Sequence, residues 1–255
     1  MAAFEALLRP FREGTPMSPM AFLQGLPTAE RILVENLSHK MHLLNAAACL
    51  PEQAEIYINF DPSIFIDHAV AMTAISELRS TLETTSVAPN RIVCELTERE
   101  TVSEETLFSL VGALRANGLR IAIDDFGAED SDMGRVRTLR PDIVKFDGDW
   151  VSRLMVSSHG LGLLSSMVST FAERGIRTLF EGIEEGWHIE LAEETGVDMV
   201  QGFALARPEI VPATFVTMPP SAGGQQLASN RTSQETSPES PPVGVHTKAF
   251  GRRTP

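Results

Sequence analysis

Seven short apolar runs in this chain each carry one polar side chain at or near their carboxyl end. Six of these side chains offer carboxylate or amide oxygens and one is a lysine: Glu5, Asn59, Glu95, Asp124, Lys145, Glu181 and Gln201. Oxygen ligands without histidine or cysteine favour hard divalent cations such as Mg²⁺ or Mn²⁺ over zinc. No histidine lies on these run ends, and the i, i+3 pair His39 and His42 is typical of a helix face in a polar stretch. The pattern therefore predicts a divalent-metal site, provided that the runs are neighbouring strands.

The adjacent acids Asp124 and Asp125 are suited to bridging two cations. Two cations roughly 3.5–4 Å apart stabilise both the attacking and the leaving oxygen of a phosphoryl displacement. Asp125-Phe126-Gly127 also matches a kinase metal-binding motif, but the chain has neither a glycine-rich nucleotide loop nor an HRD-type catalytic loop. The pattern thus favours metal-assisted phosphoryl displacement and excludes a kinase.

The elements that must position these side chains alternate between strands and helices. Helical patterns end at Gly118, Gly175 and Gly196, and each glycine is followed at once by an apolar run, which is typical of parallel βα units. One such helix is indicated by the capping box at 101–104 and by leucine and valine at helical spacing up to Leu114. Short, often β-branched runs are expected for strands buried on both faces, and they cover residues 4–8, 56–60, 92–96, 119–124, 143–146, 178–181 and 199–201.

Within each run, residue parity places the polar side chain on one face and most of the large apolar side chains on the other. The carboxyl ends of parallel strands carry the chemistry of α/β barrels. We therefore predict an α/β fold, a TIM-like (β/α) barrel, with an open doubly wound sheet as the second choice. Seven strands leave one missing from such a barrel.

Composition restricts the class of protein further. The 255 residues carry a formal net charge of −13, which argues against a protein that coats a nucleic-acid polymer. No window is apolar enough to span a membrane and the amino terminus lacks a secretory pattern, so we expect a cytoplasmic protein with no membrane partner. Cys49 and Cys94 are too few for a disulfide framework. Residues 218–255 are rich in Pro, Ser, Thr and Gly, so we predict a barrel domain at 1–217 and a disordered tail at 218–255.

With these residues in view, the sequence resembles the EAL-domain family of bacterial cyclic di-GMP phosphodiesterases over roughly residues 4–210. The motifs occur together and in the family's order: Glu5-Ala6-Leu7-Leu8-Arg9, Ile58-Asn59-Phe60, Glu95-Leu96-Thr97-Glu98, Asp124-Asp125-Phe126-Gly127, Lys145-Phe146-Asp147, Glu181-Gly182-Ile183-Glu184, Gln201-Gly202-Phe203 and Arg207-Pro208.

The resemblance implies a role for each matching residue. The expected metal ligands of a two-ion Mg²⁺ or Mn²⁺ site are Glu5, Asn59, Glu95, Asp124 and Asp125. Lys145 would orient the hydrolytic water and Glu181 would support the second metal or act as a base. Leu7, Arg9 and Gln201 would contact substrate, Arg9 through a phosphate, and Glu98 and Glu184 would steady nearby loops. The implied reaction is hydrolysis of cyclic di-GMP to linear pGpG.

Three features depart from the family pattern. The loop at 128–133 has Glu129, Asp130 and Asp132 where the family usually has a glycine-tyrosine-serine-serine stretch, and this loop would carry a homodimer contact. The family's first strand, which precedes the name-giving motif, is absent, and Pro10 replaces an aromatic residue. Two functions therefore stay open: an active phosphodiesterase, or an impaired relative that acts as a cyclic di-GMP receptor or a protein-interaction module.

Overall fold

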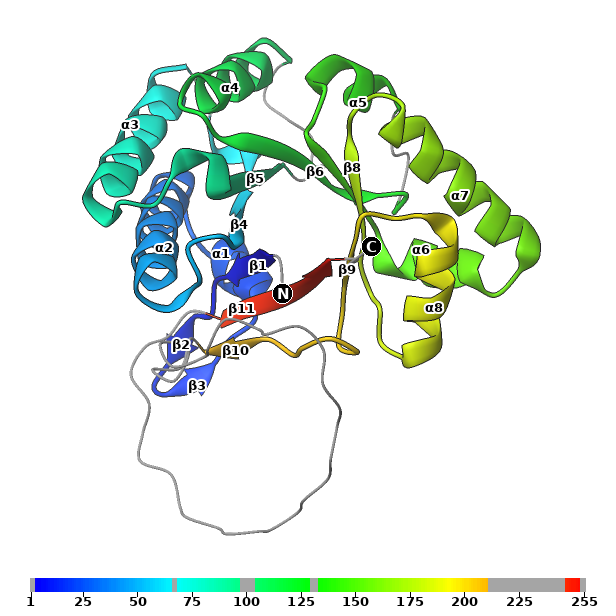
Figure 1. Ribbon diagram of the computed structural model, residues 1–255. Helices are drawn as coiled ribbons and strands as arrows, with labels where there is room; N and C mark the ends of the chain where they lie inside the picture. The colour runs from blue at the N-terminus through cyan, green and yellow to red at the C-terminus, as the bar shows by residue number, and fades with distance from the viewer. Residues whose placement is uncertain (1–2, 66–67, 97–103, 129–132, 211–245, 253–255) are drawn as a thin grey trace, which may run out of the picture.

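The computed structural model describes residues 3–65, 68–96, 104–128, 133–210 and the strand 246–252. Its main feature is a curled sheet in which seven neighbouring strands run parallel (Figure 1). In sheet order these strands are β1 (Ala3–Leu7), β4 (Glu55–Phe60), β5 (Ile92–Leu96), β6 (Arg120–Phe126), β7 (Ile143–Phe146), β8 (Arg177–Phe180) and β9 (Met199–Gln201). All seven predicted strands are confirmed.

A further strand, β11 (His246–Arg252), closes the sheet. It pairs antiparallel with β1 on one side and with β9 on the other, and Figure 1 shows it crossing between these two strands. The closed TIM-like barrel is therefore confirmed, and the open doubly wound sheet is not formed. A short strand β10 (Glu209–Ile210) also pairs with β11, and β2 (Phe11–Arg12) and β3 (Thr15–Pro16) form a separate hairpin.

The strand β11 lies within residues 218–255, the segment that the sequence predicts to be a disordered tail. That prediction weighed only the low apolar content of the segment. It could not include the backbone hydrogen bonds that the open edges of β1 and β9 offer to an added strand. The rest of the predicted tail, and the predicted boundary at 217, lie outside the described residues.

Helices surround the sheet and alternate with its strands (Figure 1). Each parallel strand is followed by at least one helix on the way to the next, as expected for βα units. The helices are α1 (Pro19–Gln24), α2 (Thr28–Cys49), α3 (His68–Thr85), α4 (Glu104–Ala116), α5 (Met133–Leu139), α6 (Gly148–Met155), α7 (Ser158–Ala172) and α8 (Gly186–Thr195), with short 3₁₀ turns at Pro62–Ile64 and Pro89–Arg91. None of the described helices is long and apolar enough to cross a membrane.

The predicted glycine stops are confirmed by their backbone conformation. Gly118, Gly175 and Gly196 have φ values of 79°, 72° and 80°, in the left-handed region that residues with a Cβ avoid. Each therefore ends a helix and turns the chain into the next strand.

The barrel has two apolar layers. A large core packs between the sheet and the helices. A second cluster fills the inside of the barrel with one residue from each parallel strand: Ala3, Tyr57, Val93, Ala122, Ile143, Leu179 and Met199. Each lies two residues before one of the seven polar residues singled out in the sequence. Because alternate residues of a strand share a face, the seven polar residues lie directly above this inner apolar layer.

Candidate functional site

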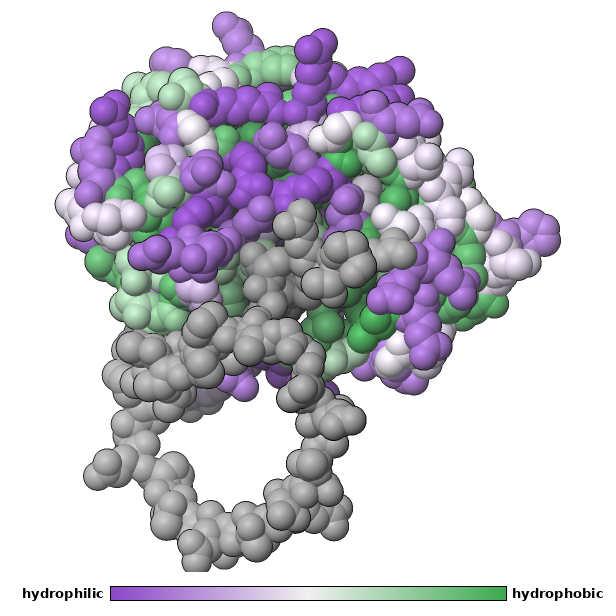
Figure 2. Space-filling model, viewed as in Figure 1, coloured by the Kyte–Doolittle hydropathy of each residue, from purple (hydrophilic) through white to green (hydrophobic). Residues whose placement is uncertain are grey.

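The polar residues at the strand ends gather above the inner apolar layer, as their parity predicts. Glu5, Glu95, Asp124, Lys145 and Gln201 are buried. Figure 2 shows hydrophilic side chains over the middle of one face of the molecule, inside the ring of helices. These residues come from strands far apart in the sequence, so only the closed sheet brings them together.

Lys145 is the centre of this cluster. Its Nζ lies 2.5 Å from Oε1 of Glu95, 2.7 Å from Oδ1 of Asp124 and 3.0 Å from Oε1 of Glu181. The lysine side chain is only 1% exposed. A buried lysine is stable only with compensating charge, and here β5, β6 and the residue that follows β8 each supply a carboxylate.

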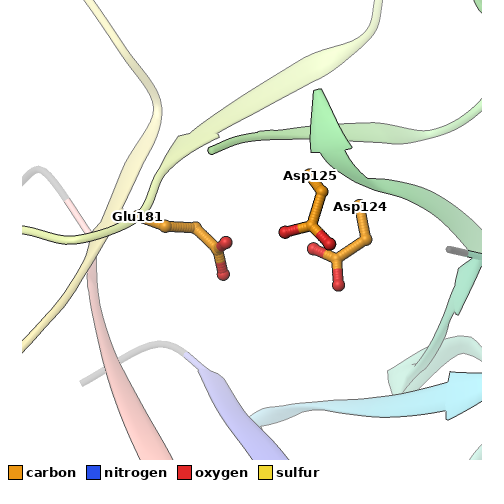
Figure 3. A group of neighbouring side chains, drawn as sticks. All are labelled: Asp124, Asp125 and Glu181. Carbon is orange, nitrogen blue, oxygen red and sulfur yellow. The ribbon is translucent and has the colours of Figure 1, made fainter. Parts of the chain in front are cut away.

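Three carboxylates meet beside this lysine. Oxygen atoms of Asp124, Asp125 and Glu181 all lie within 4.8 Å of one another, and Figure 3 shows the three carboxyl groups pointing into a common space. This is the close spacing that a shared divalent cation requires, and it places Glu181 with the aspartate pair that the sequence singled out.

A bulge at the end of β6 directs both aspartates to the site. Consecutive strand residues normally point to opposite faces, but the register between β6 and β7 shifts between Ile123 and Phe126. Asp125 takes a positive φ of 55° at this point. The bulge therefore explains how neighbouring acids can serve one site, which parity alone would forbid.

Two contacts hold the bulge. The backbone amide of Asp147 donates to the carbonyl of Phe126 at 3.0 Å. Gly127 has a φ of 99°, and a Cβ on it would lie 2.5 Å from Cδ2 of Trp150. Trp150 therefore packs directly on the turn that follows the aspartate pair, a position that only glycine can accommodate.

Glu5 and Gln201 connect the two ends of the parallel sheet. Nε2 of Gln201 donates a hydrogen bond to Oε2 of Glu5 at 2.7 Å. Glu5 belongs to β1 and Gln201 to β9, so this contact spans the strands that β11 separates. It brings the first and the last predicted site residues together.

Burial changes the protonation of the cluster. It raises the pKa of Glu95 well above its usual value, raises that of Glu181 to about 7 against the opposing effect of Lys145, and raises that of Asp125 to about 6, with Asp124 adding to the increase. Burial alone would lower the pKa of Lys145, but Asp124, Glu181 and Glu95 raise it well above its usual value. Without a cation these acids therefore tend to keep their protons, whereas Lys145 keeps its positive charge.

The donor set fits divalent cations. Every candidate ligand offers oxygen, as hard cations such as Mg²⁺ and Mn²⁺ prefer. Oε2 of Glu95 and Oε1 of Gln201 are buried and have no hydrogen-bond partner among the described residues. Buried polar atoms are normally satisfied, and a bound cation or its water would satisfy these two.

Asn59, Leu7 and Arg9 lie farther out, at the rim. Asn59 is exposed at the end of β4, and Leu7 and Arg9 are half-buried at and just beyond the end of β1. All three line a cavity of about 430 Å³ between these strand ends and helices α1 and α2. Leu7 and Arg9, the predicted substrate-contacting residues of the first motif, thus border one cavity together with Asn59.

The end of β4 is held from behind by α2. Nε2 of His39 donates to the carbonyl of Asn59 at 2.8 Å, and Oε1 of Glu35 accepts from the amide of Asp61 at 3.1 Å. Glu35 is not among the residues predicted from the sequence, and His39 and His42, predicted to lie on a helix face in a polar stretch, are buried. The available signal was the spacing of Glu35, His39 and His42, which places three polar residues on one helix face.

The loop-stabilising roles of Glu98 and Glu184 stay predictions. Glu98 lies outside the described residues, as does the divergent stretch 129–132, so the predicted homodimer contact stays a prediction. Glu184 is exposed beyond the end of β8, and its backbone amide donates to Nδ1 of His188 at 3.2 Å.

The fold and the site together define a TIM-like barrel protein with an all-oxygen acidic centre at its strand ends. A family model described as the EAL domain matches residues 1–208. The chain therefore belongs to the EAL domain family, as the sequence motifs predicted.

Several characterised or named proteins are similar to this chain. It is 28% identical over 203 residues to the probable cyclic di-GMP phosphodiesterase PdeG of Escherichia coli K12, covering 76% of this chain and 39% of that protein. A solved structure of BlrP1 from Klebsiella pneumoniae, a complex with manganese and cyclic di-GMP at pH 6, matches with a TM-score of 0.71 and 25% identity. That match covers 80% of this chain and 50% of the solved chain.

A second BlrP1 structure, a complex with calcium and cyclic di-GMP at pH 8.0, matches at 26% identity and a TM-score of 0.70, over 80% of this chain and 50% of the solved one. The chain spans from a quarter to about two fifths of the length of the first curated relatives it matches.

Proposed function

We propose that this chain is a divalent-metal-dependent phosphodiesterase that hydrolyses cyclic di-GMP to linear pGpG. The observation that carries the proposal is the buried cluster in which Lys145 contacts Glu95, Asp124 and Glu181, with Asp125 beside them. Relatives named as cyclic di-GMP phosphodiesterases and metal complexes of BlrP1 with cyclic di-GMP support the choice of substrate.

The acidic side chains would hold two cations. Glu5, Asn59, Glu95 and Asp124 are the ligands for the first, and Asp124, Asp125 and Glu181 are those for the second. Bound Mg²⁺ or Mn²⁺ would neutralise charge on the phosphodiester and make water more acidic. This neutralisation is needed because the anionic phosphodiester would otherwise approach a cluster of acidic side chains.

The remaining residues position the reactants. Lys145, held by three carboxylates, supplies a fixed positive charge and a donor for the attacking water. Glu181, which lies 3.0 Å from Nζ of Lys145, would accept the proton of that water. Arg9 at the rim pairs with a phosphate through its planar guanidinium, and the cavity beside Leu7 receives a guanine base.

The alternative function is a cyclic di-GMP receptor or protein-interaction module with impaired catalysis. It is favoured by one sequence feature, the three acids Glu129, Asp130 and Asp132 that follow the aspartate pair. Added negative charge there would repel an anionic substrate. Retention of all seven strand-end residues favours the enzyme.

The test is hydrolysis of cyclic di-GMP by the purified chain, with products separated by chromatography, in Mg²⁺, in Mn²⁺ and in a chelator. We expect metal-dependent pGpG. Substrate binding by the folded chain without any product in either metal would replace the enzyme with the receptor.

The variant Glu181→Gln should lower turnover at least 100-fold, because it removes both a ligand and the proton acceptor. Glu83→Gln is the matched control, since Glu83 is exposed on α3 and pairs with the exposed Arg79. Equal turnover by the two variants would remove Glu181 from the mechanism.

A further inference from the structure

The strand β11 fills the gap between the first and the last parallel strands. Residues 246–250 pair in antiparallel register with Leu7 to Ala3 of β1. On its other side, residues 250–252 pair with Gln201 to Met199 of β9, and residues 246 and 247 pair with β10. The segment is thus held along one edge by β1 and along the other by β9 and β10.

This gap is bordered by two residues of the candidate site. Glu5 is the register partner of Lys248 and Gln201 is the register partner of Phe250. Both site residues therefore stand on backbone that pairs directly with β11. In the sheet order of the described strands β11 stands between β1 and β9, while the side chains of Glu5 and Gln201 meet across it at 2.7 Å.

We propose that the gap between β1 and β9 is a strand-docking slot whose occupant is residues 246–252, and that docking sets the active geometry of the Glu5–Gln201 pair. The part of this inference that concerns turnover rests on the proposed phosphodiesterase function. The docking itself does not, because it depends only on backbone pairing.

The physical basis is the open edge of a parallel sheet. Without β11, β1 and β9 would expose rows of unpaired N–H and C=O groups, which is the setting in which an extended segment adds to a sheet. Main-chain hydrogen bonds then hold the segment. Because the chain tethers the segment to the barrel, its effective concentration is of the order of millimolar, so even weak intrinsic affinity would fill the slot.

Release of the segment would act on the site by changing the distance between β1 and β9. The contact between Glu5 and Gln201 needs the two strands to stay at the separation that one intervening strand imposes, about 4.8 Å per strand step. Catalysis is sensitive to displacements of about 1 Å. A segment remote in sequence from the catalytic motifs would therefore control the placement of a metal ligand.

The experiment is hydrogen–deuterium exchange of the full chain, followed by mass spectrometry, for the native sequence and for Ala249→Pro. Proline within a strand removes a ladder hydrogen bond and restricts the backbone. We expect amides of 246–252 to be protected in the native chain, and Ala249→Pro to abolish that protection and speed exchange in β1 and β9. Ala228→Pro is the matched control and should leave all three segments unchanged.

A synthetic peptide of the native sequence 244–255 keeps the test decisive if Ala249→Pro is unstable. Added in excess, it should restore protection in β1 and β9, and restore a turnover that the variant has lost by at least 10-fold, whereas a scrambled peptide should not. Rapid exchange of 246–252 in the native chain, or unaltered β1, β9 and turnover in Ala249→Pro, would overturn the docking proposal. Protection that follows the expected pattern without turnover in any sample would leave docking standing and reject the phosphodiesterase.

Discussion

At the scale of single residues, the positive charge of Lys145 stabilises the buried acidic cluster. The lysine contacts the carboxylates of Glu95, Asp124 and Glu181 within 3.0 Å and is almost completely buried. Its charge allows Glu95, Asp124 and Glu181 to lie close together before any cation binds. A bound cation would neutralise the same acids as Lys145, so removal of the lysine should make the protein depend more on the cation.

The variant Lys145→Met tests this dependence. It leaves buried acids without their cation, so the metal-free protein should lose roughly 3–5 kcal/mol of stability. Mn²⁺ should raise its melting temperature more than it raises that of the native chain, because the ion replaces the missing charge. Thermal unfolding with Mn²⁺ and with a chelator measures both. Equal metal-induced shifts in the two proteins would contradict the shared role.

At the scale of elements, the bulge of β6 is the feature that brings two neighbouring acids into one cluster. Asp124 and Asp125 are neighbours, yet both face the cluster because the register shifts after Ile123. Trp150 packs on Gly127 in the turn that follows the two aspartates. The rim is organised by a different element, since α2 holds the end of β4 through Glu35 and His39.

Gly127→Ala should disrupt the packing of Trp150 on the turn that follows the two aspartates. The new Cβ would face both a φ of 99° and a contact of 2.5 Å with Trp150, so we expect a loss of roughly 2–4 kcal/mol and a fall in turnover. Gly175→Ala is the control, because its φ is 72° but nothing lies within 4 Å of its Cβ position. It should cost about 1 kcal/mol and leave turnover unchanged. Chemical denaturation and initial rates compare the two, and equal effects would remove Trp150 from the argument.

Because Glu35 titrates, the contact between α2 and β4 should make the stability of the protein depend on pH. Burial raises the pKa of Glu35 to about 8, with Asp61 adding to the rise and the Asp61 amide and Arg31 opposing it. The folded state therefore binds a proton that the unfolded state releases near its ordinary value of 4.5. The contribution of Glu35 to the free energy of unfolding is therefore fully present below about pH 4.5, and it is lost as the pH rises toward 8.

The variant Glu35→Gln should remove the fall in stability that Glu35 causes as the pH rises. Its stability relative to the native chain should increase from pH 5 to pH 8 by roughly 1–3 kcal/mol, as measured by denaturation at each pH. A difference that does not vary with pH would place a charged glutamate in the folded protein.

At the scale of the whole molecule, the barrel separates a chemical end from a stabilising end. The carboxyl ends of the strands hold the acidic cluster, whereas the amino ends hold an ion-pair group in which Glu55 bridges Arg120 and Arg177 at 2.8 and 2.9 Å. The inner apolar layer lies between the two ends. This arrangement agrees with the general division of labour in barrel folds.

Arg177→Met should therefore affect stability and not catalysis. Loss of a half-buried partner of Glu55 should lower stability by roughly 1–3 kcal/mol, while the rate constant for cyclic di-GMP hydrolysis stays within about twofold of the native value. A large fall in that rate constant with an unchanged fold would show that the two ends are coupled.

The sequence by itself determined the parallel strands, the glycine stops and the seven strand-end residues, because strand parity and helix periodicity are local properties that the backbone imposes. It also determined the family through motifs in a set order. Only the tertiary structure decided three further matters. They are the bulge that turns Asp125 toward Asp124, the contacts of Glu35 and His39 with β4, and the closure of the barrel by residues 246–252. Each depends on partners distant in the sequence, whose positions exist only once the sheet has curled.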